Sequence, residues 1–94
     1  MNHSCDPTAV VKVASGSDFV SVIAGPRGIE CGEAITFFYP STEWELSRPF
    51  ECFCGSGACL KVIRGAKYLD AEVLGRWYVN EHIWDQKGKM RSRL

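Results

Sequence analysis

The chain has 94 residues, and its 11 basic and 11 acidic side chains give a formal net charge of zero. This balance argues against general binding to nucleic acid or to an anionic membrane, and no apolar run approaches the roughly 20 residues of a membrane span. A composition that is 46% apolar excludes a disordered polymer and favours one small folded domain. Because a signal-peptide pattern is missing, we expect an intracellular protein whose five cysteines serve as metal ligands or free thiols before disulfides.

The first part of the chain is rich in β-branched residues. Residues 8–14 (T-A-V-V-K-V-A) and 18–24 (D-F-V-S-V-I-A) lie on either side of a Ser/Gly turn at residues 15–17. Two such segments around a short turn predict a β-hairpin. Residues 34–39 (A-I-T-F-F-Y) predict a third strand that ends at Pro40.

The last part of the chain has a helical pattern. Residues 70–79 predict a helix, because Asp70 can cap its N-terminus and Leu74 and Trp77 share one face. The tail from Gln86 onward is polar and basic, and we expect it to fray. The predicted fold class is therefore mainly β with a C-terminal helix.

Three of the cysteines, Cys52, Cys54 and Cys59, form the pattern C-x-C-x4-C. On an extended backbone the side chains at i and i+2 point to the same side, so the first two can converge on one ion. The glycines that follow let the chain fold back, which brings the third cysteine to the same point. A structural zinc needs four ligands, and one is therefore still to be found. The side chains available for it are Cys5, Cys31, His3 and His82.

The spacing of the cysteines alone leaves alternatives to zinc open. Cysteine is often a small buried apolar residue, and an iron–sulfur cluster also takes four thiolates. A disulfide is disfavoured between Cys52 and Cys54, because cysteines at i and i+2 are poorly placed to bridge each other. Zinc is the ion that the pattern favours, and Cys31 is more simply a plain thiol.

Three stretches together resemble the SET-domain protein lysine methyltransferases that carry a post-SET zinc motif. N-H-S-C-D-P at residues 2–7 is similar to the family's N-H-x-C-x-P-N signature, with Thr8 where Asn is usual. G-E-A-I-T-F-F-Y at residues 32–39 is similar to the family's strand that ends in the active-site tyrosine, with Phe38 in place of the usual Asp. C-F-C-G-S-G-A-C at residues 52–59 matches the post-SET pattern. The order and the separations of the three stretches are also those of the family.

This resemblance implies a reaction and its site. The reaction is the transfer of a methyl group from S-adenosylmethionine to a lysine amine, with Zn²⁺ as a structural ion. The implied fourth zinc ligand is Cys5, beside Cys52, Cys54 and Cys59, and Tyr39 is the implied catalytic hydroxyl. The residues implied to bind the cofactor are Asn2, His3, Phe53 and Leu60.

The resemblance also implies a division of the chain. Residues 1–48 correspond to the C-terminal part of a SET domain, residues 49–66 to the post-SET zinc motif, and residues 67–94 to a C-terminal helix and basic tail. The family's N-terminal half, with its Gly-rich cofactor-binding strand, has no counterpart in this sequence. We therefore expect a partial SET β-fold that is truncated and has weak or no activity alone.

The partners follow from the same resemblance. The implied substrate is a lysine-bearing protein, with a histone tail as the common case, which would place the protein in the nucleus and otherwise in the cytoplasm. Open strand edges would invite pairing with another chain. The alternative function is a non-catalytic, zinc-stabilised module that binds a protein partner. The basic tail is better explained as a solvated segment than as a nucleic-acid contact.

Overall fold

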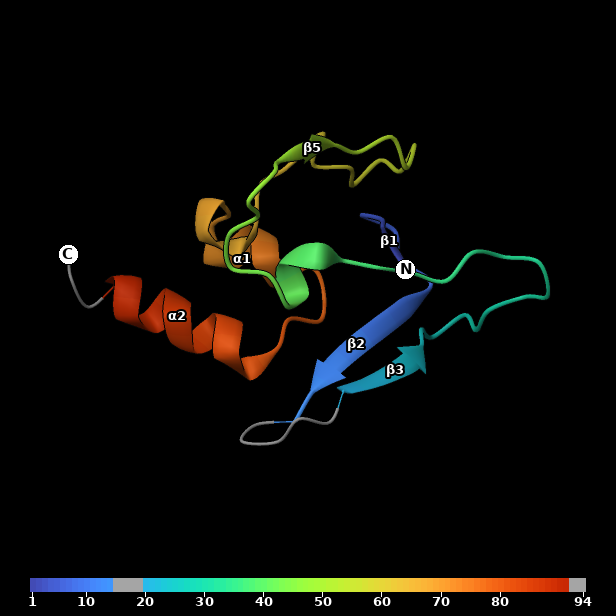
Figure 1. Cartoon of the computed structure of the whole chain (residues 1–94), viewed down its shortest axis with the longest axis horizontal. Helices are drawn as coiled ribbons and strands as arrows, with labels where there is room; N and C mark the ends of the chain where they lie inside the picture. Colours follow the sequence, from blue (N-terminus) through green and yellow to red (C-terminus); the bar gives the residue numbers. More distant parts are fainter. Residues whose placement is uncertain (15–19, 92–94) are drawn as a thin grey trace.

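The computed structural model describes residues 1–14 and 20–91 and measures 46 × 31 × 23 Å along its principal axes. Within these residues the strands form three two-stranded sheets, and two α-helices lie in the C-terminal part (Figure 1). The strands are β1 (Asn2–His3), β2 (Ala9–Val13), β3 (Val20–Ala24), β4 (Thr36–Phe37), β5 (Phe50–Glu51) and β6 (Val62–Ile63). This arrangement agrees with a small, strand-rich fold that has a C-terminal helix.

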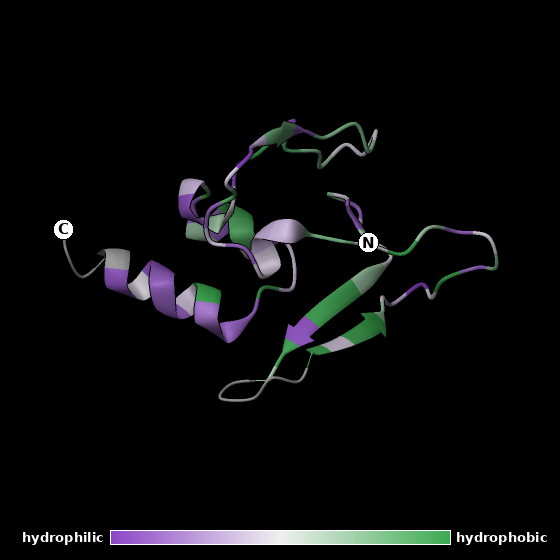
Figure 2. Ribbon diagram, viewed as in Figure 1, coloured by the Kyte–Doolittle hydropathy of each residue, from purple (hydrophilic) through white to green (hydrophobic). Residues whose placement is uncertain are grey.

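The predicted hairpin is confirmed by the antiparallel pairing of β2 with β3, from Ala9↔Ala24 to Val13↔Val20. Its predicted turn, at residues 15–17, lies outside the described part of the chain. The two strands differ in burial, since Ala9 and Val11 of β2 are buried whereas all five residues of β3 are exposed. Figure 2 shows that both strands are largely apolar, so β3 presents apolar side chains to solvent.

The predicted third strand is shorter than the pattern suggested. Only β4 is a strand, and it pairs in parallel with β1 in the register Asn2↔Thr36 and His3↔Phe37. The chain then turns into a 3-10 helix, η1 (Tyr39–Ser41), so Pro40 lies inside a helical turn instead of ending a strand at Tyr39. The strand is short because its partner β1 has only two residues, which can pair with only two residues of β4.

The helical prediction for residues 70–79 is partly wrong. The helix α1 (Ala71–Leu74) ends at Gly75, which lies after only one turn. Asp70 does occupy the N-cap position, although its side chain makes no capping hydrogen bond. Residues 86–91 of the tail that was expected to fray belong to α2 (Glu81–Arg91), which is polar on nearly every face. The remaining residues of that tail, 92–94, lie outside the described part of the chain.

No helix in the described residues is both long enough and apolar enough to cross a bilayer.

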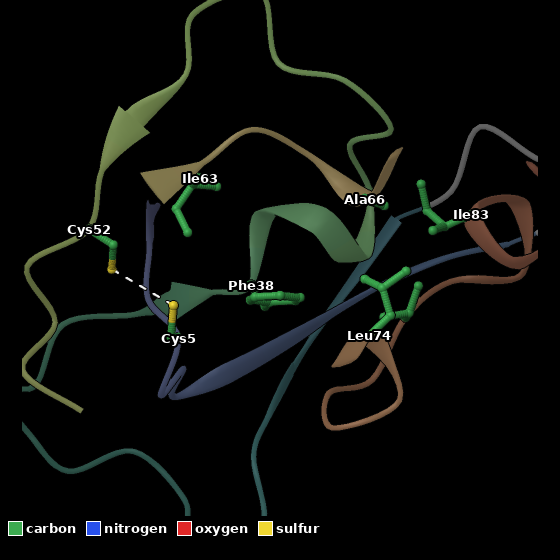
Figure 3. Close-up of a cluster of buried hydrophobic side chains, with 8 residues drawn as sticks. Cys5, Phe38, Cys52, Ile63, Ala66, Leu74 and Ile83 are labelled. Carbon is green, nitrogen blue, oxygen red and sulfur yellow. Dashed lines mark hydrogen bonds between the residues drawn. The ribbon is translucent and has the colours of Figure 1, made fainter. Parts of the chain in front are cut away.

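The core lies between the cysteine-containing loop and the two helices (Figure 3). A second 3-10 helix, η2 (Ala66–Tyr68), follows β6 and contributes the fully buried Ala66. Ile83 is the one buried side chain among residues 81–89, so it attaches α2 to this core. The buried members of the cluster are Cys5, Phe38, Cys52, Ile63, Ala66, Leu74, Val79 and Ile83.

Asn80 connects the C-terminal part of the chain to the hairpin, and it is only 1% exposed. Its Nδ2 donates to the carbonyl oxygens of Val11 (2.8 Å) and Ser41 (2.9 Å), and its Oδ1 accepts from the Val13 N–H (2.9 Å). Alternate residues of a strand direct their backbone groups to the same edge. The amide therefore meets β2 as a neighbouring strand would, while it also holds the end of η1.

Candidate functional site

The four cysteines of the predicted metal site lie together in the structure. The Sγ atoms of Cys5, Cys52, Cys54 and Cys59 are all within 4.8 Å of one another. Figure 3 shows Cys5 and Cys52 facing each other from separate segments, with their sulfur atoms 3.9 Å apart. Zinc–sulfur bonds of about 2.3 Å in a tetrahedron put sulfur atoms roughly 3.8 Å apart, so the cluster needs only small adjustments to hold an ion.

The backbone of the cysteine loop (residues 52–59) explains how three thiols meet. Gly55 has a positive φ of +75°, which lets the chain reverse after Cys54 as the sequence predicted. The loop is closed at its base by the Cys52 N–H, which donates to the Lys61 carbonyl oxygen (2.6 Å) and extends the pairing of β5 with β6. The turn is therefore built by a short hairpin with a glycine at its bend.

Backbone amides also point at the sulfur atoms. The Leu60 N–H donates to Cys5 Sγ (3.3 Å), and the Lys61 N–H donates to Cys59 Sγ (3.4 Å). Hydrogen bonds of this kind stabilise a thiolate relative to a thiol, because the donor carries a partial positive charge. These amides fit sulfur atoms that act as metal ligands.

The thiols of the cluster have unequal acidity. Burial raises the pKa of Cys5 to about 12, with further upward contributions from the neighbouring Cys52 and Cys59, and burial also raises the pKa of Cys52. The pKa of Cys54 is lowered to about 6, chiefly by a hydrogen bond from the Ser56 backbone. Several of these neighbouring thiols cannot easily be ionised at the same time, because their negative charges repel each other, unless a bound cation compensates the charges.

His3 joins the cysteine cluster to Tyr39. Its Nδ1 accepts the Tyr39 backbone N–H (3.1 Å), and its Nε2 lies 3.4 Å from Cys5 Sγ. A backbone N–H can only donate, so Nδ1 is unprotonated and the neutral ring carries its proton on Nε2, toward the sulfur. Burial lowers the pKa of His3 to about 4, which agrees with a neutral ring.

Tyr39 stands in a group of aromatic rings. The ring centroids of Phe37, His3 and Phe50 lie 4.8, 5.3 and 5.7 Å from that of Tyr39. Its hydroxyl group donates to the Met1 carbonyl oxygen (3.0 Å) and remains near the surface. The structure therefore brings Tyr39 beside His3, whose ring in turn contacts Cys5. Tyr39 stands at the start of η1 instead of at a strand end.

The residues expected to bind a cofactor are spread around this point. Asn2 is exposed in β1, Leu60 is half-buried and packs against the core, and the ring of Phe53 is 85% exposed. Next to Phe53 the surface is hollowed by an open cavity of about 480 Å³. The residues that line this cavity are Glu51, Cys52, Phe53, Gly55, Cys59, Lys61 and Val62.

Of the other side chains considered for the fourth position, His3 contacts Cys5, whereas Cys31 and His82 lie away from the cluster. Cys31 is an exposed free thiol in the loop between β3 and β4, and the metal-capable cluster does not include it. His82 lies at the start of α2, where its Nε2 is 3.0 Å from the Thr42 carbonyl oxygen. Among the described residues, Cys5 is thus the candidate that joins the other three.

Two residues at the site were not identified from the sequence pattern. Trp77 was placed only on a helix face, yet its Nε1–H donates to the Cys5 carbonyl oxygen (2.8 Å). Thr8, which departs from the family signature, exchanges hydrogen bonds with Thr36 and Ala34. A tryptophan near a cysteine cluster gives no signal in the sequence, because the contact joins residues 72 positions apart.

Comparison with known proteins shows similarity to methyltransferases. No family model matches the chain, and no solved structure matches it significantly. The chain is 43% identical over 84 residues to the methyltransferase flvH of Aspergillus flavus, an alignment that covers 89% of this chain and 46% of that protein. It is 35% identical over 104 residues to an H3 lysine-36 specific histone-lysine N-methyltransferase of Debaryomyces hansenii and 38% identical over 76 residues to one of Candida albicans.

The alignments differ in how much of each protein they include. They cover 98% and 79% of this chain, but only 14% and 9% of the two histone-lysine methyltransferases. The chain thus spans about half the length of the Aspergillus protein and a small part of the other two. Over most of its length, the chain is similar to one part of proteins that are named methyltransferases.

Proposed function

We propose that this chain contributes the zinc-binding and tyrosine-bearing part of an S-adenosylmethionine-dependent protein-lysine N-methyltransferase of the SET type. In this proposal residues 1–48 belong to the SET domain, residues 49–66 are the post-SET zinc motif and residues 67–94 form a C-terminal segment. The observation that carries the proposal is the chain of contacts from Cys5 Sγ through His3 to the Tyr39 backbone, which links the metal cluster to the expected catalytic residue.

The cysteine cluster supports zinc as the ion. Four thiols with sulfur atoms within 4.8 Å match the four-sulfur, tetrahedral preference of a structural zinc. Three ligands come from the cysteine loop and the fourth from Cys5, so a bound ion would hold that loop against β1. This would fix the loop beside Tyr39.

The surface near the loop supports a nucleoside-type methyl donor. The cavity of about 480 Å³ falls in the size range of ordinary ligand sites, and the exposed ring of Phe53 offers an apolar surface for a planar base. Asn2, His3 and Leu60 are the other residues proposed to contact the donor, and they lie outside the lining of this cavity. When bound, S-adenosylmethionine supplies a methyl group that its sulfonium sulfur has already activated.

Tyr39 and its neighbours would prepare the lysine. An amine in water has a pKa near 10.4, and entry into the aromatic surroundings of Tyr39 would favour its neutral, nucleophilic form by removing water. The Tyr39 hydroxyl, which here donates to the Met1 carbonyl oxygen, would orient the amine lone pair toward the methyl carbon. A nitrogen–carbon bond forms as the sulfur–carbon bond breaks, and the amine proton leaves to solvent.

The substrate class is inferred from the relatives. The Debaryomyces and Candida proteins are named for lysine 36 of histone H3, whereas the Aspergillus protein is named only as a methyltransferase. We propose a lysine side chain of a protein as the acceptor, with histone H3 as the first substrate to test.

The first experiment tests the metal. Elemental analysis of protein purified under reducing conditions should find one zinc per chain, and Cys5→Ser should lose most of it. The matched control is Cys31→Ser, which changes an exposed thiol outside the cluster and should keep the wild-type zinc content. Zinc-free protein, or full zinc in Cys5→Ser, would contradict the proposal.

The second experiment tests the chemistry. Calorimetric titration should detect binding of S-adenosylmethionine, and labelled cofactor should transfer methyl groups to histone H3. Tyr39→Phe keeps the ring but removes the hydroxyl group, and it should lower the transfer rate by about 100-fold or more. Both measurements should be repeated in the presence of the part of the Aspergillus protein that lies outside the alignment, because this chain spans 46% of that protein.

A second function is favoured by the exposed strand β3. Val20, Val22 and Ile23 are 57%, 49% and 43% exposed, which is unusual for a strand with this composition. A non-catalytic, zinc-stabilised module could pair this strand with a protein partner. Zinc-loaded protein that binds no S-adenosylmethionine, alone or with the complementing Aspergillus segment, would favour this alternative.

A further inference from the structure

The segment between α1 and α2 contacts the main chain of Cys5 and the ring of Phe38 through Trp77. Trp77 makes two contacts there, one polar and one aromatic. Its indole N–H donates to the Cys5 carbonyl oxygen at 2.8 Å. Its ring stacks on Phe38, with centroids 4.0 Å apart and ring planes only 9° from parallel.

These two contacts fix two points that the proposed function needs. Cys5 is held by its main chain on one side and presents its sulfur to the cluster on the other. Phe38 is 2% exposed and immediately precedes Tyr39. Trp77 thus contacts both the main chain of the outlying cysteine and the ring next to the residue that carries the phenol.

Contacts from outside the cysteine loop must bring the fourth thiol to the site. Three of its four thiols come from eight consecutive residues, whereas Cys5 lies 47 residues before Cys52. The cost of bringing the fourth ligand to the ion is therefore mainly the cost of ordering the Cys5 segment. A group that orders this segment in advance raises metal affinity without touching the ion.

We propose that Trp77 is a positioning residue for the metal centre, and that through it metal binding is coupled to the order of residues 74–83. The proposal rests on the zinc site described above. Coupling of this kind is reciprocal, so an ion that holds Cys5 in place must also stabilise the segment that holds Cys5. If Trp77 served only as core packing, its indole N–H would not matter to the metal.

The substitution that separates these two roles is Trp77→Phe. Phenylalanine retains an aromatic ring over Phe38 but cannot donate a hydrogen bond to Cys5. The matched control is Trp84→Phe, which makes the same chemical change on α2 at a residue that is 37% exposed and outside the core cluster. Both variants should be compared with the full wild-type chain.

Cobalt(II) reports on the site through its thiolate charge-transfer absorption. In a competition with a chelator, we expect Trp77→Phe to bind cobalt about 3- to 10-fold more weakly than wild type, which is what one hydrogen bond is worth. We also expect its charge-transfer spectrum to shift, while Trp84→Phe matches wild type in both. Wild-type affinity and an unchanged spectrum in Trp77→Phe would overturn the proposal.

A measurement on the wild type decides the matter if Trp77→Phe does not fold. Zinc should slow amide hydrogen exchange in residues 74–83 by about threefold or more, the factor expected from the same coupling. Protection confined to the cysteine loop and β1 would overturn the coupling but leave the metal site intact. A wild-type chain that binds neither cobalt nor zinc would instead overturn the proposed metal site itself.

Discussion

Replacing Asn80 with alanine removes a buried amide that three backbone groups share. The Val13 N–H and the Val11 carbonyl oxygen would lose their side-chain partner, and the Ser41 carbonyl oxygen would keep only the Asn80 backbone N–H at 3.1 Å. Solvent cannot replace these bonds directly, because Asn80 is 1% and Ser41 3% exposed. We therefore expect Asn80→Ala to be strongly destabilising.

The magnitude follows from the number of bonds. Each lost hydrogen bond costs about 1 kcal/mol, and a backbone group left buried without a partner costs about 1 to 3 kcal/mol. Three bonds therefore give a loss of about 3 to 5 kcal/mol. A chain of this length has a total stability of about 5 to 14 kcal/mol, so the loss is a large share of the total, and the Tm should fall by at least about 12 °C.

Urea denaturation followed by circular dichroism measures this loss directly. The control is Gln86→Ala, which removes an exposed amide from α2 and should change the free energy of unfolding by less than about 0.5 kcal/mol. Asn80→Asp should be as harmful as Asn80→Ala, because it turns the donor that faces two carbonyl oxygens into an acceptor. A loss below about 1 kcal/mol in Asn80→Ala would refute the reasoning.

Three further predictions concern the loops and the surface. Gly65→Ala should lower the free energy of unfolding by at least about 2 kcal/mol, because Gly65 has a φ of +115° and an added Cβ would lie 2.5 Å from the Trp44 carbonyl oxygen. Gly88→Ala, at an exposed position of α2, should instead raise it by about 0.5 to 1 kcal/mol. Equal effects of the two variants in denaturant titrations would contradict this. Removal of metal by a chelator should speed proteolysis of the cysteine loop and leave the cleavage rate within β2 and β3 unchanged. If the chelator instead speeds cleavage first within β2 or β3, a structural ion in the cysteine loop is contradicted. Lys67→Ala breaks an ion pair with Glu45 (3.4 Å), but both side chains are about half exposed, so calorimetry should find little change in stability; a large loss would contradict this.

The features that sequence reasoning predicted are those set by local geometry. The pairing of β2 with β3 follows from two segments rich in β-branched residues around a short turn, and the convergence of Cys52, Cys54 and Cys59 follows from their spacing and from Gly55. The placement of Cys5 beside them came from the family resemblance, and its spacing alone did not distinguish it from Cys31. The structure brings Cys5 to the cluster.

The features that were missed depend on contacts between distant residues. The strand predicted over residues 34–39 contains only the two residues that can pair with β1, and this limit is set by another segment. The sequence of α2 shows no continuous apolar face, and among residues 81–89 Ile83 is the one buried side chain. The contact of Trp77 with Cys5 and the amide of Asn80 against β2 likewise leave no periodic signal.

The wide separation of the contacts made by Cys5 has a consequence for biosynthesis. Its partners Cys52 and Trp77 follow it by 47 and 72 residues. At the usual ribosomal speed, synthesis of 72 residues takes roughly 4 to 14 s. During translation the segment around Cys5 therefore waits for seconds before Trp77 is available to cover it. A nascent chain would thus be most sensitive to oxidants before its C-terminal part leaves the ribosome.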